Sequence, residues 1–340
     1  MKNSKIRIGI AGSAGYTGGE LLRLLLHHPN AELVSIVSTT HAGEPFWSAH
    51  PDLLGQSDKT FDAALTREPL DILFLCLGHG VSARFLTDND TRNVAHVIDL
   101  SQDFRHFSDR HYIGIPSRDF LYALPEAYPN AADYTRALVQ AGNVANPGCF
   151  ATALQLALLP LAQEGMLEKC VHVQAVTGAT GAGAKLTDTG HFAYRQNNLS
   201  AYKPFTHQHL QEIRETLMKK QSATALPPIH FIPLRGDFAR GIFASLYTVC
   251  SLSQDAATDL YTSYYAPHPF VHVAPFAISL KQVVHTNNCF IHVEKHDDLL
   301  YITCAIDNLL KGASGTAVQN MNLLMGLDQS TGLQLNSIAY

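Results

Sequence analysis

The stretch IRIGIAGSAGYTGGELLRLLLHH, residues 6–28, decides the fold of the chain. Its apolar start is typical of a short buried strand, and its leucine-rich end has the periodicity of a helix. Between them lies a G-x-x-G-x-x-G turn, which can bring the N–H groups of a helix N-terminus close to a pyrophosphate. Such a turn can also merely join a strand to a helix. Its place between strand and helix predicts a dinucleotide site formed by Gly12, Ser13, Ala14, Gly15, Tyr16, Thr17 and Gly18.

The rest of the chain shows two regimes. Up to about residue 100, short apolar strands alternate with helical patterns, which predicts an α/β fold with a Rossmann-type, doubly wound parallel sheet. Beyond residue 147, alternating apolar and polar residues predict an α+β domain with a mostly antiparallel sheet. We expect residues 1–147 to form the dinucleotide-binding domain and residues 148–312 a catalytic and oligomerisation domain. The closing segment, 313–340, is expected to pack back on the first domain through an amphipathic helix over 313–327.

The composition is typical of a globular protein that acts on small molecules. Apolar residues make up 46% of the 340 residues and charged residues 16%, which excludes a disordered chain. A formal net charge of −5 offers no basic stripe for nucleic acid, and no uninterrupted apolar run reaches the length of about 18 residues that a membrane span needs. The six cysteines are scattered without a C-x-x-C pair, which predicts reduced thiols and a cytoplasmic protein.

The end of the second strand bears on the choice of dinucleotide. NAD-binding folds place an acid there for the ribose hydroxyl, but this chain has Val37-Ser38-Thr39-Thr40-His41. Hydroxyls and a histidine can accept a 2′-phosphate, so the sequence favours NADP (NADPH), with Ser38 and Thr39 at the ribose. A second glycine-rich segment, 177–183, is either a plain loop or a further wall against the cofactor, to which Gly181 and Gly183 would belong.

A cysteine follows a proline–glycine turn in Asn146-Pro147-Gly148-Cys149, directly before an apolar run that is typical of a helix. At the first turn of a helix the dipole lowers a thiol pKa and backbone N–H groups can stabilise an oxyanion. Cys149 is therefore the candidate nucleophile. The remaining cysteines lie in or beside apolar strands and are expected to be small core residues: Cys76, Cys170, Cys250, Cys289 and Cys304.

A thiolate that forms a covalent intermediate usually needs a partner for proton transfer. His207 and His209 are the local candidates, although in a chain with 18 histidines each one alone is more often a surface or hydrogen-bonded residue. Their spacing also suits a pair of metal ligands, but no third ligand follows at a convincing spacing. We therefore expect no metal site.

Together these motifs resemble the N-acetyl-gamma-glutamyl-phosphate reductase family and, more distantly, aspartate-semialdehyde dehydrogenase. The resemblance covers nearly the whole chain, and the order and spacing of the motifs are more specific than any one of them. The motifs are GSAGYTGGELLRLL (12–25), DLSQDFR (99–105), YALPE (122–126), NPGCFATA (146–153), TGATGAGAK (177–185), HQHLQE (207–212), RG (240–241) and DNLLKGASG (307–315).

The resemblance implies a semialdehyde dehydrogenase-like fold, an oligomer of two or four copies and a step of arginine biosynthesis. Cys149 would attack an acyl phosphate and form a thioester, which NADPH would reduce to an aldehyde. His207 or His209 would be the acid–base group, and we favour His207. Lys311 and Gly312 match a family loop near the cofactor.

An anionic substrate needs fixed cations, and Arg105 and Lys203 are our candidates, although both could equally be solvated surface charges. Three departures from the family pattern concern the fit of cofactor and substrate. An arginine is missing after the hydroxyls of the second strand, Ala123 replaces a common glycine, and Ala184 replaces a frequent arginine.

Two other functions stay open. The same chemistry could act on an N-succinyl-glutamyl, carrier-bound aminoadipyl or aspartyl phosphate, because the sequence does not show which cations line the pocket. A protein that binds NADP without turnover could instead sense redox state through Cys149. The histidine pair argues against a sensor, which would not need an acid–base group.

Overall fold

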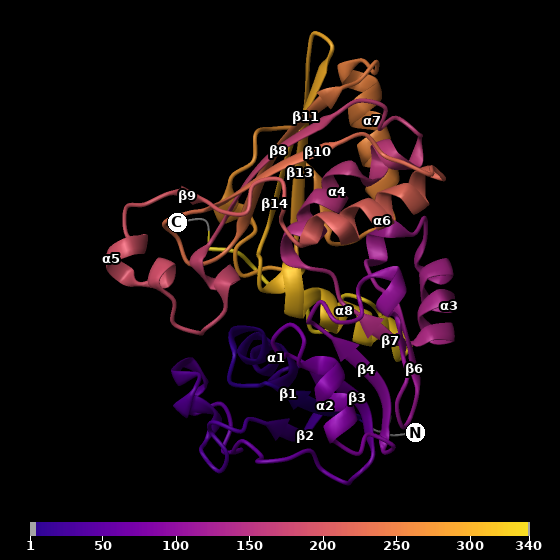
Figure 1. Ribbon diagram of the computed structural model, residues 1–340. Helices are drawn as coiled ribbons and strands as arrows, with labels where there is room; N and C mark the ends of the chain where they lie inside the picture. The colour runs from indigo at the N-terminus through magenta and orange to yellow at the C-terminus, as the bar shows by residue number, and fades with distance from the viewer. Residues whose placement is uncertain (1–4, 339–340) are drawn as a thin grey trace. The chain divides into compact units, whose positions relative to one another are not determined.

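The computed structural model describes residues 5–338 of the protein and divides into two units (Figure 1). One unit takes the chain up to residue 123 together with residues 134–147 and 313–334. The other takes residues 124–133 and 148–312 and the chain from residue 335. The segments 124–133 and 335–338, which we expected with the first domain, thus group with the second unit.

The first unit is built on a seven-stranded sheet with the strand order β2-β1-β3-β4-β7-β6-β5. All neighbouring strands are parallel except β5 and β6, which confirms the predicted Rossmann-type sheet. Its inner strands are almost continuously buried, as a parallel sheet covered on both faces requires. The strands are β1 (Ile6–Ala11), β2 (Ala31–Val37), β3 (Leu70–Leu75), β4 (Val94–Asp99), β5 (His111–Tyr112), β6 (Arg118–Tyr122) and β7 (Gly142–Ala145).

Four helices accompany these strands in the chain order of the unit: α1 (Tyr16–Leu26), α2 (Ser82–Asp88), α3 (Ala131–Ala141) and α8 (Gly315–Leu324). The helix expected within 313–327 is present as α8 and groups with the first unit, but it is not amphipathic, because every residue of α8 is buried. Its polar side chains are satisfied inside the unit. Asn320 accepts a hydrogen bond from the Tyr134 hydroxyl and donates one to the carbonyl of Ala123, and Asn322 contacts His28.

The second unit is built on another seven-stranded sheet, with the order β12-β13-β14-β11-β8-β10-β9. Four of its neighbouring pairs are antiparallel and two, β8–β10 and β12–β13, are parallel, which confirms a mostly antiparallel sheet. The strands are β8 (Val171–Thr177), β9 (Ser200–Ala201), β10 (Ile229–Arg235), β11 (Ile242–Val249), β12 (Val271–Val273), β13 (Cys289–His296) and β14 (Leu299–Ile306).

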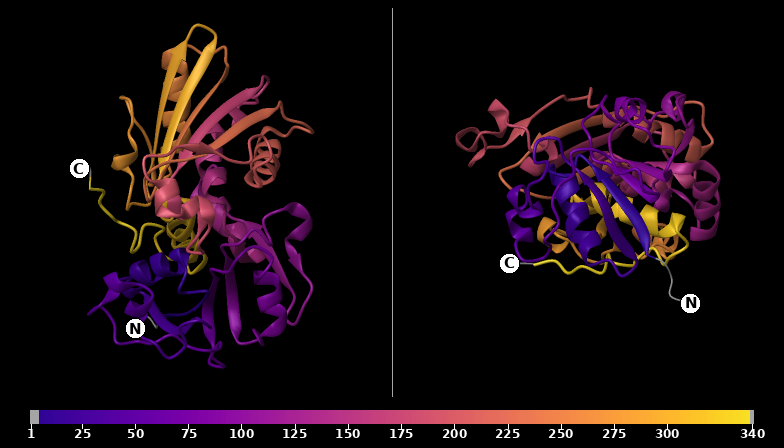
Figure 2. Two further views of the ribbon diagram at one scale, coloured as in Figure 1. Left: turned by 60° about the vertical axis from the view of Figure 1, so that its left-hand side comes forward. Right: turned by 90° about the horizontal axis from the view of Figure 1, so that it is seen from below.

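Helix α4 lies beside the sheet of the second unit (Figure 2). Its residues from Phe150 to Ala162 are all buried, and it packs against α6 and against strands β11 and β14. The unit's helices are α4 (Cys149–Gln163), α5 (Phe192–Arg195), α6 (His209–Gln221) and α7 (Gln254–Tyr265). None of the helices within residues 5–338 combines the length and the apolar character needed to cross a bilayer.

Candidate active site

Cys149 is the first residue of α4, as the sequence predicts, and its side chain is half-buried. Gly148 caps the helix in an extended conformation and donates its N–H to Oε2 of Glu212 at 3.1 Å. The sulfur therefore starts at the positive end of a 15-residue helix, where a thiolate is stabilised.

Gly312 lies directly against the cysteine, although it is far away in the chain. A Cβ at Gly312 would come within 2.9 Å of the Cβ of Cys149, a distance that real Cβ atoms do not reach. The Gly312 N–H also donates to the carbonyl of Asp307 at 2.9 Å. Only glycine fits this position without moving the cysteine. Its role at the cofactor stays a prediction.

His207 is buried beside the same helix. Its ring packs edge-on against Phe150, the residue after Cys149, with 5.4 Å between ring centroids. Burial, together with the positive charges of Lys203 and Arg235, lowers the pKa of His207 to about 4. The His207 Nδ1 atom faces the backbone N–H of His209 at 3.2 Å and accepts its hydrogen bond. A neutral His207 ring thus carries its proton on Nε2 and is a hydrogen-bond donor there.

His209 opens helix α6 and is also buried. Its Nε2 atom lies 3.8 Å from Oε1 of Glu212, a carboxylate that is 2% exposed. Glu212 follows His209 by three residues, so the helix places both side chains on one face. A carboxylate beside an imidazole favours the imidazolium, which is what a proton-accepting histidine needs.

Tyr202 and Arg235 are two residues of this site that the sequence analysis missed. The guanidinium of Arg235 lies over the Tyr202 ring, 4.8 Å from its centroid. Burial, with a smaller contribution from nearby Cys149, raises the pKa of Tyr202 to about 12 despite the opposing effect of Arg235. The phenol is therefore neutral at physiological pH. Arg235 supplies a half-buried cation near His207 and Tyr202.

The two cations chosen from the sequence lie in different settings. Lys203 is exposed, has a left-handed backbone (φ 44°) and donates from Nζ to Oε1 of Gln208 at 3.2 Å. Arg105 belongs to the first unit, is 3% exposed, and donates to the carbonyls of Asn146 and Leu100. Those contacts favour a structural task for Arg105. Both assignments to the substrate stay predictions.

Lys311 is fully buried, and its ammonium donates to Oε1 of Glu126 at 2.6 Å. The proximity of Lys311 lowers the pKa of the Glu126 carboxyl despite the opposing effect of burial. This ion pair belongs to the interior of the second unit, and the cofactor role of Lys311 stays a prediction.

The glycine-rich turn of the first unit joins β1 to α1. Gly12 has φ +79°, and a Cβ there would lie 2.5 Å from the carbonyl oxygen of Cys76. A Cβ at Gly18 would lie 2.6 Å from the backbone of Ser13. Gly15, the N-cap of α1, is different, because its Cβ would meet nothing closer than 3.6 Å. The fold thus requires Gly12 and Gly18, whereas Gly15 leaves space over the helix N-terminus that a ligand can fill.

The predicted ribose site lies at the end of β2. Ser38 is buried and its hydroxyl is 3.3 Å from that of Thr40, while Thr39 is exposed. The Nδ1 atom of His41 lies 2.8 Å from Oε2 of Glu44 and is hydrogen-bonded to it. The predicted ribose site therefore contains a carboxylate as well as the hydroxyls and the histidine.

The loop 177–183 belongs to the second unit. Gly183 has φ +80° and Gly181 lies in a 3₁₀ turn over Ala179–Ala182.

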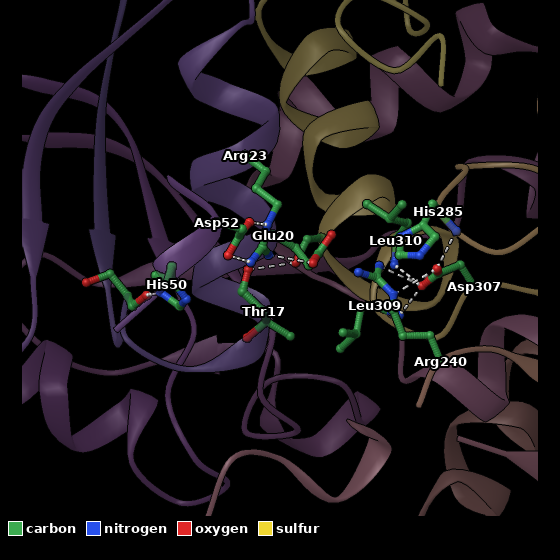
Figure 3. Close-up of polar contacts among 12 residues, drawn as sticks. Thr17, Glu20, Arg23, His50, Asp52, Arg240, His285, Asp307, Leu309 and Leu310 are labelled. Carbon is green, nitrogen blue, oxygen red and sulfur yellow. Dashed lines mark hydrogen bonds and ion pairs between the residues drawn. The ribbon is translucent and has the colours of Figure 1, made fainter. Parts of the chain in front are cut away.

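A buried ion pair holds the chain that leads to Gly312 (Figure 3). Arg240 donates from Nε and Nη2 to the two oxygens of Asp307, each at 3.1 Å. The same carboxylate accepts the N–H groups of His285, Leu309 and Leu310. Asp307 therefore fixes the backbone just before the glycine that contacts Cys149. Among the described residues no group of three or more histidine, cysteine, aspartate or glutamate side chains could hold a metal ion.

Comparison with protein families identifies both halves of the chain. Residues 7–134 match the model of the semialdehyde dehydrogenase NAD binding domain, and residues 149–308 match that of the semialdehyde dehydrogenase dimerisation domain. Solved structures share this fold at low sequence identity. Aspartate semialdehyde dehydrogenase II from Vibrio cholerae is 14% identical, with a TM-score of 0.70 over 95% of this chain and 99% of that one. The aspartate semialdehyde dehydrogenase from Candida albicans is 13% identical, with a TM-score of 0.65 over the same shares of the two chains.

Closer relatives carry one name, N-acetyl-gamma-glutamyl-phosphate reductase. The protein from Flavobacterium johnsoniae is 48% identical over 97% of this chain and 98% of its own length. The protein from Bacteroides fragilis strain YCH46 is also 48% identical, over 98% of this chain and 100% of its own. The chain belongs to the N-acetyl-gamma-glutamyl-phosphate reductase family.

Proposed function

We propose that the protein reduces N-acetyl-gamma-glutamyl phosphate with NADPH, giving N-acetylglutamate semialdehyde and phosphate in arginine biosynthesis. The observation that carries this proposal is Cys149 at the N-terminus of α4, beside the buried pair of His207 and His209. The name of the relatives, which match the chain over nearly its full length, supports the substrate.

The cysteine carries the acyl group. The Cys149 thiolate attacks the acyl carbon, the carbon–oxygen bond to phosphate breaks, and a thioester remains. Bound NADPH supplies the hydride that reduces the thioester. The resulting thiohemiacetal collapses, the carbon–sulfur bond breaks, and the aldehyde leaves as the thiolate reforms. The dipole of α4 stabilises the thiolate in both the attacking and the departing form.

The two histidines have different tasks in this proposal. His209, paired with Glu212, takes the proton of the Cys149 thiol and returns it to the departing phosphate. His207 stays neutral and donates from Nε2 to the oxygen of the reacting carbonyl, because its Nδ1 is occupied by a backbone N–H. This division reverses the preference for His207 as acid–base group that we drew from the sequence.

The glycine-rich turn fits the dinucleotide. The N-terminal turn of α1 contains no acidic residue, and the space above Gly15 lets a pyrophosphate approach the helix N–H groups. Ser38, Thr39 and His41 would hold the 2′-phosphate. Arg235 and Lys203 are the cations that we assign to the anionic groups of the substrate, because both act on His207.

The reaction can be tested in reverse, as phosphate-dependent reduction of NADP by N-acetylglutamate semialdehyde. We expect turnover by the wild type that is lost in Cys149→Ala and severely reduced in Cys149→Ser, with NADPH binding unchanged in both. Mass spectrometry after incubation with acyl phosphate alone should show the acyl adduct on Cys149 of the wild type. Unchanged turnover in Cys149→Ala would overturn the mechanism.

The same assay separates the remaining substrates and the sensor. N-succinylglutamate, aminoadipate and aspartate semialdehydes are offered in parallel at equal concentrations, and the substrate is the one with the highest kcat/KM. If none turns over while NADPH binds, the protein is a dinucleotide-binding sensor and not a reductase.

We also propose a homodimer in the cytoplasm, formed through the open face of the second sheet. The description of the matched dimerisation domain supports self-association. Strands β8, β10, β11 and β14 carry His172, His230, Tyr247 and Tyr301 around a hollow of about 550 Å³ on this face. Sedimentation velocity with Tyr247→Arg tests the face, because a charge at a half-exposed tyrosine should dissociate the dimer.

A further inference from the structure

We propose that His50 is a positioning residue that fixes the glycine-rich turn for the pyrophosphate of the dinucleotide. The inference rests on the proposed use of NADPH and adds a residue outside the turn to its binding site. His50 follows the turn by more than 30 residues and lies in the irregular segment 41–61 between β2 and β3.

The contact is a buried hydrogen bond to the turn itself. The Nε2 atom of His50 lies 2.8 Å from the carbonyl oxygen of Ser13, and the histidine is 6% exposed. Burial lowers the pKa of His50, so the ring is neutral and its Nε2–H is the donor. Ser13 is also held by β2, since both its N–H and its hydroxyl donate to the carbonyl of Val37.

The ring of His50 also packs against helix α1. A Cβ at Gly19 would lie 2.5 Å from Cε1 of the ring, so the glycine directly after the turn leaves room for the histidine. His50 therefore contacts both the loop that precedes the helix and the first turns of the helix. This arrangement sets the direction in which the helix N–H groups point.

The segment that carries His50 is anchored independently of the turn. Asp52 pairs with Arg23 of α1, and Arg23 also pairs with Glu20. These three are the charged groups that act on the pKa of His50. Arg23 lowers this pKa and the two acids raise it, so their effects oppose one another. The start of the segment is fixed to its end, because Ala42 bridges to Phe61 and the ring of Phe46 packs on that of Phe61.

The pyrophosphate is common to NADPH and NADH, and this fact defines the experiment. NADPH, NADH and ADP-ribose are titrated calorimetrically into wild type and His50→Ala. Loss of a buried donor should weaken all three by about the same factor, roughly tenfold. His50→Gln, whose amide can reach the same carbonyl, should recover most of the affinity. The KM for NADPH should rise by the same factor in His50→Ala.

Two further variants separate positioning from general damage. Gly19→Ala pushes the ring away without removing it and should weaken the same three ligands, which tests the inference even if His50→Ala does not fold. His27→Gln is the matched control, because His27 is exposed and contacts the same segment through Gln56 but not the turn. It should leave all three affinities unchanged.

The possible results distinguish the two levels of the proposal. A folded His50→Ala that binds all three ligands as the wild type does overturns the role of His50. Loss of NADPH affinity alone also overturns it, because the histidine would then act at the 2′-phosphate. If the wild type binds neither NADPH nor NADH, the proposed function fails, and the inference about His50, which rests on it, fails with it.

Discussion

The Nε2 atom of His209 lies 3.8 Å from Oε1 of Glu212, and both side chains are buried at the start of α6. The second oxygen of Glu212 accepts the N–H of Gly148, the residue before the nucleophile. One carboxylate therefore orients the proposed base and fixes the turn that presents the thiol. The sequence of neither segment predicts the contact between Gly148 and Glu212, because the two residues are 64 positions apart in the chain.

Glu212→Gln should slow the reaction while leaving the turn in place, because the amide oxygen can still accept from Gly148. The neutral amide no longer stabilises the positive charge that His209 gains as it accepts the thiol proton, and we expect kcat to fall by about 10²-fold. The rate of Cys149 alkylation by iodoacetamide at pH 7 should fall with it. Glu215→Gln on the same helix is the control. A Glu212→Gln enzyme that keeps wild-type kcat would contradict the role of the pair.

His207 should make stability depend on pH. Its pKa in the folded chain, about 4, lies below the ordinary value of 6.5, so the fold disfavours the imidazolium. The stability from a neutral ring is complete above pH 6.5 and is lost as the pH falls towards 4. The total is up to about 3 kcal/mol at 1.36 kcal/mol per pH unit. Urea unfolding of wild type and His207→Gln should show a smaller rise of stability with pH in the variant.

Asp99 should change the pH dependence of stability in the opposite direction to His207, over nearly the same pH range. Burial raises its pKa to about 6, against the hydrogen bonds of Ser82 and Ser101 that favour the carboxylate. The folded pKa exceeds the ordinary 3.8, so stability is complete below pH 3.8 and is lost as the pH rises through 6. Asp99→Asn should therefore unfold in urea with a steeper rise of stability between pH 4 and 6 than the wild type. An unchanged slope would show that Asp99 is ionised throughout.

Arg235 should hold an anion of the substrate. Arg235→Met should raise the KM for phosphate or for the semialdehyde about 10- to 100-fold in the reverse reaction, as loss of a charged hydrogen bond does. A rise for phosphate alone places the leaving group at Arg235, and a rise for the semialdehyde alone places the carboxylate there. Arg214→Met, an exposed position on α6, is the control. If neither the KM for phosphate nor the KM for the semialdehyde changes, Arg235 does not bind the substrate and only packs against the Tyr202 ring.

The features that the sequence predicts well are local ones. The turn at Gly12 and the helix start at Cys149 follow from a few neighbouring residues whose backbone preferences agree. The contacts of Arg235 and Glu212 depend on how distant elements pack, so only the resemblance to a family could point to them. The error at α8 has the same origin. Asn320 and Asn322 resemble a solvent face in the sequence, but buried partners satisfy them.

Gly312→Ala should separate the position of the nucleophile from the stability of the fold. The added methyl group would come within 2.9 Å of the Cβ of Cys149 and 3.2 Å of its Cα, so the first turn of α4 must move. Catalysis is sensitive to such a shift because attack needs reacting atoms about 3–3.5 Å apart and aligned. We expect kcat to fall by about 10²-fold with little change in the KM for NADP. Gly78→Ala is the control, because its methyl group would meet only a Val81 side chain at 3.8 Å. Wild-type kcat in a folded Gly312→Ala protein would show that Cys149 tolerates displacement, and the close contact would then be a matter of packing alone.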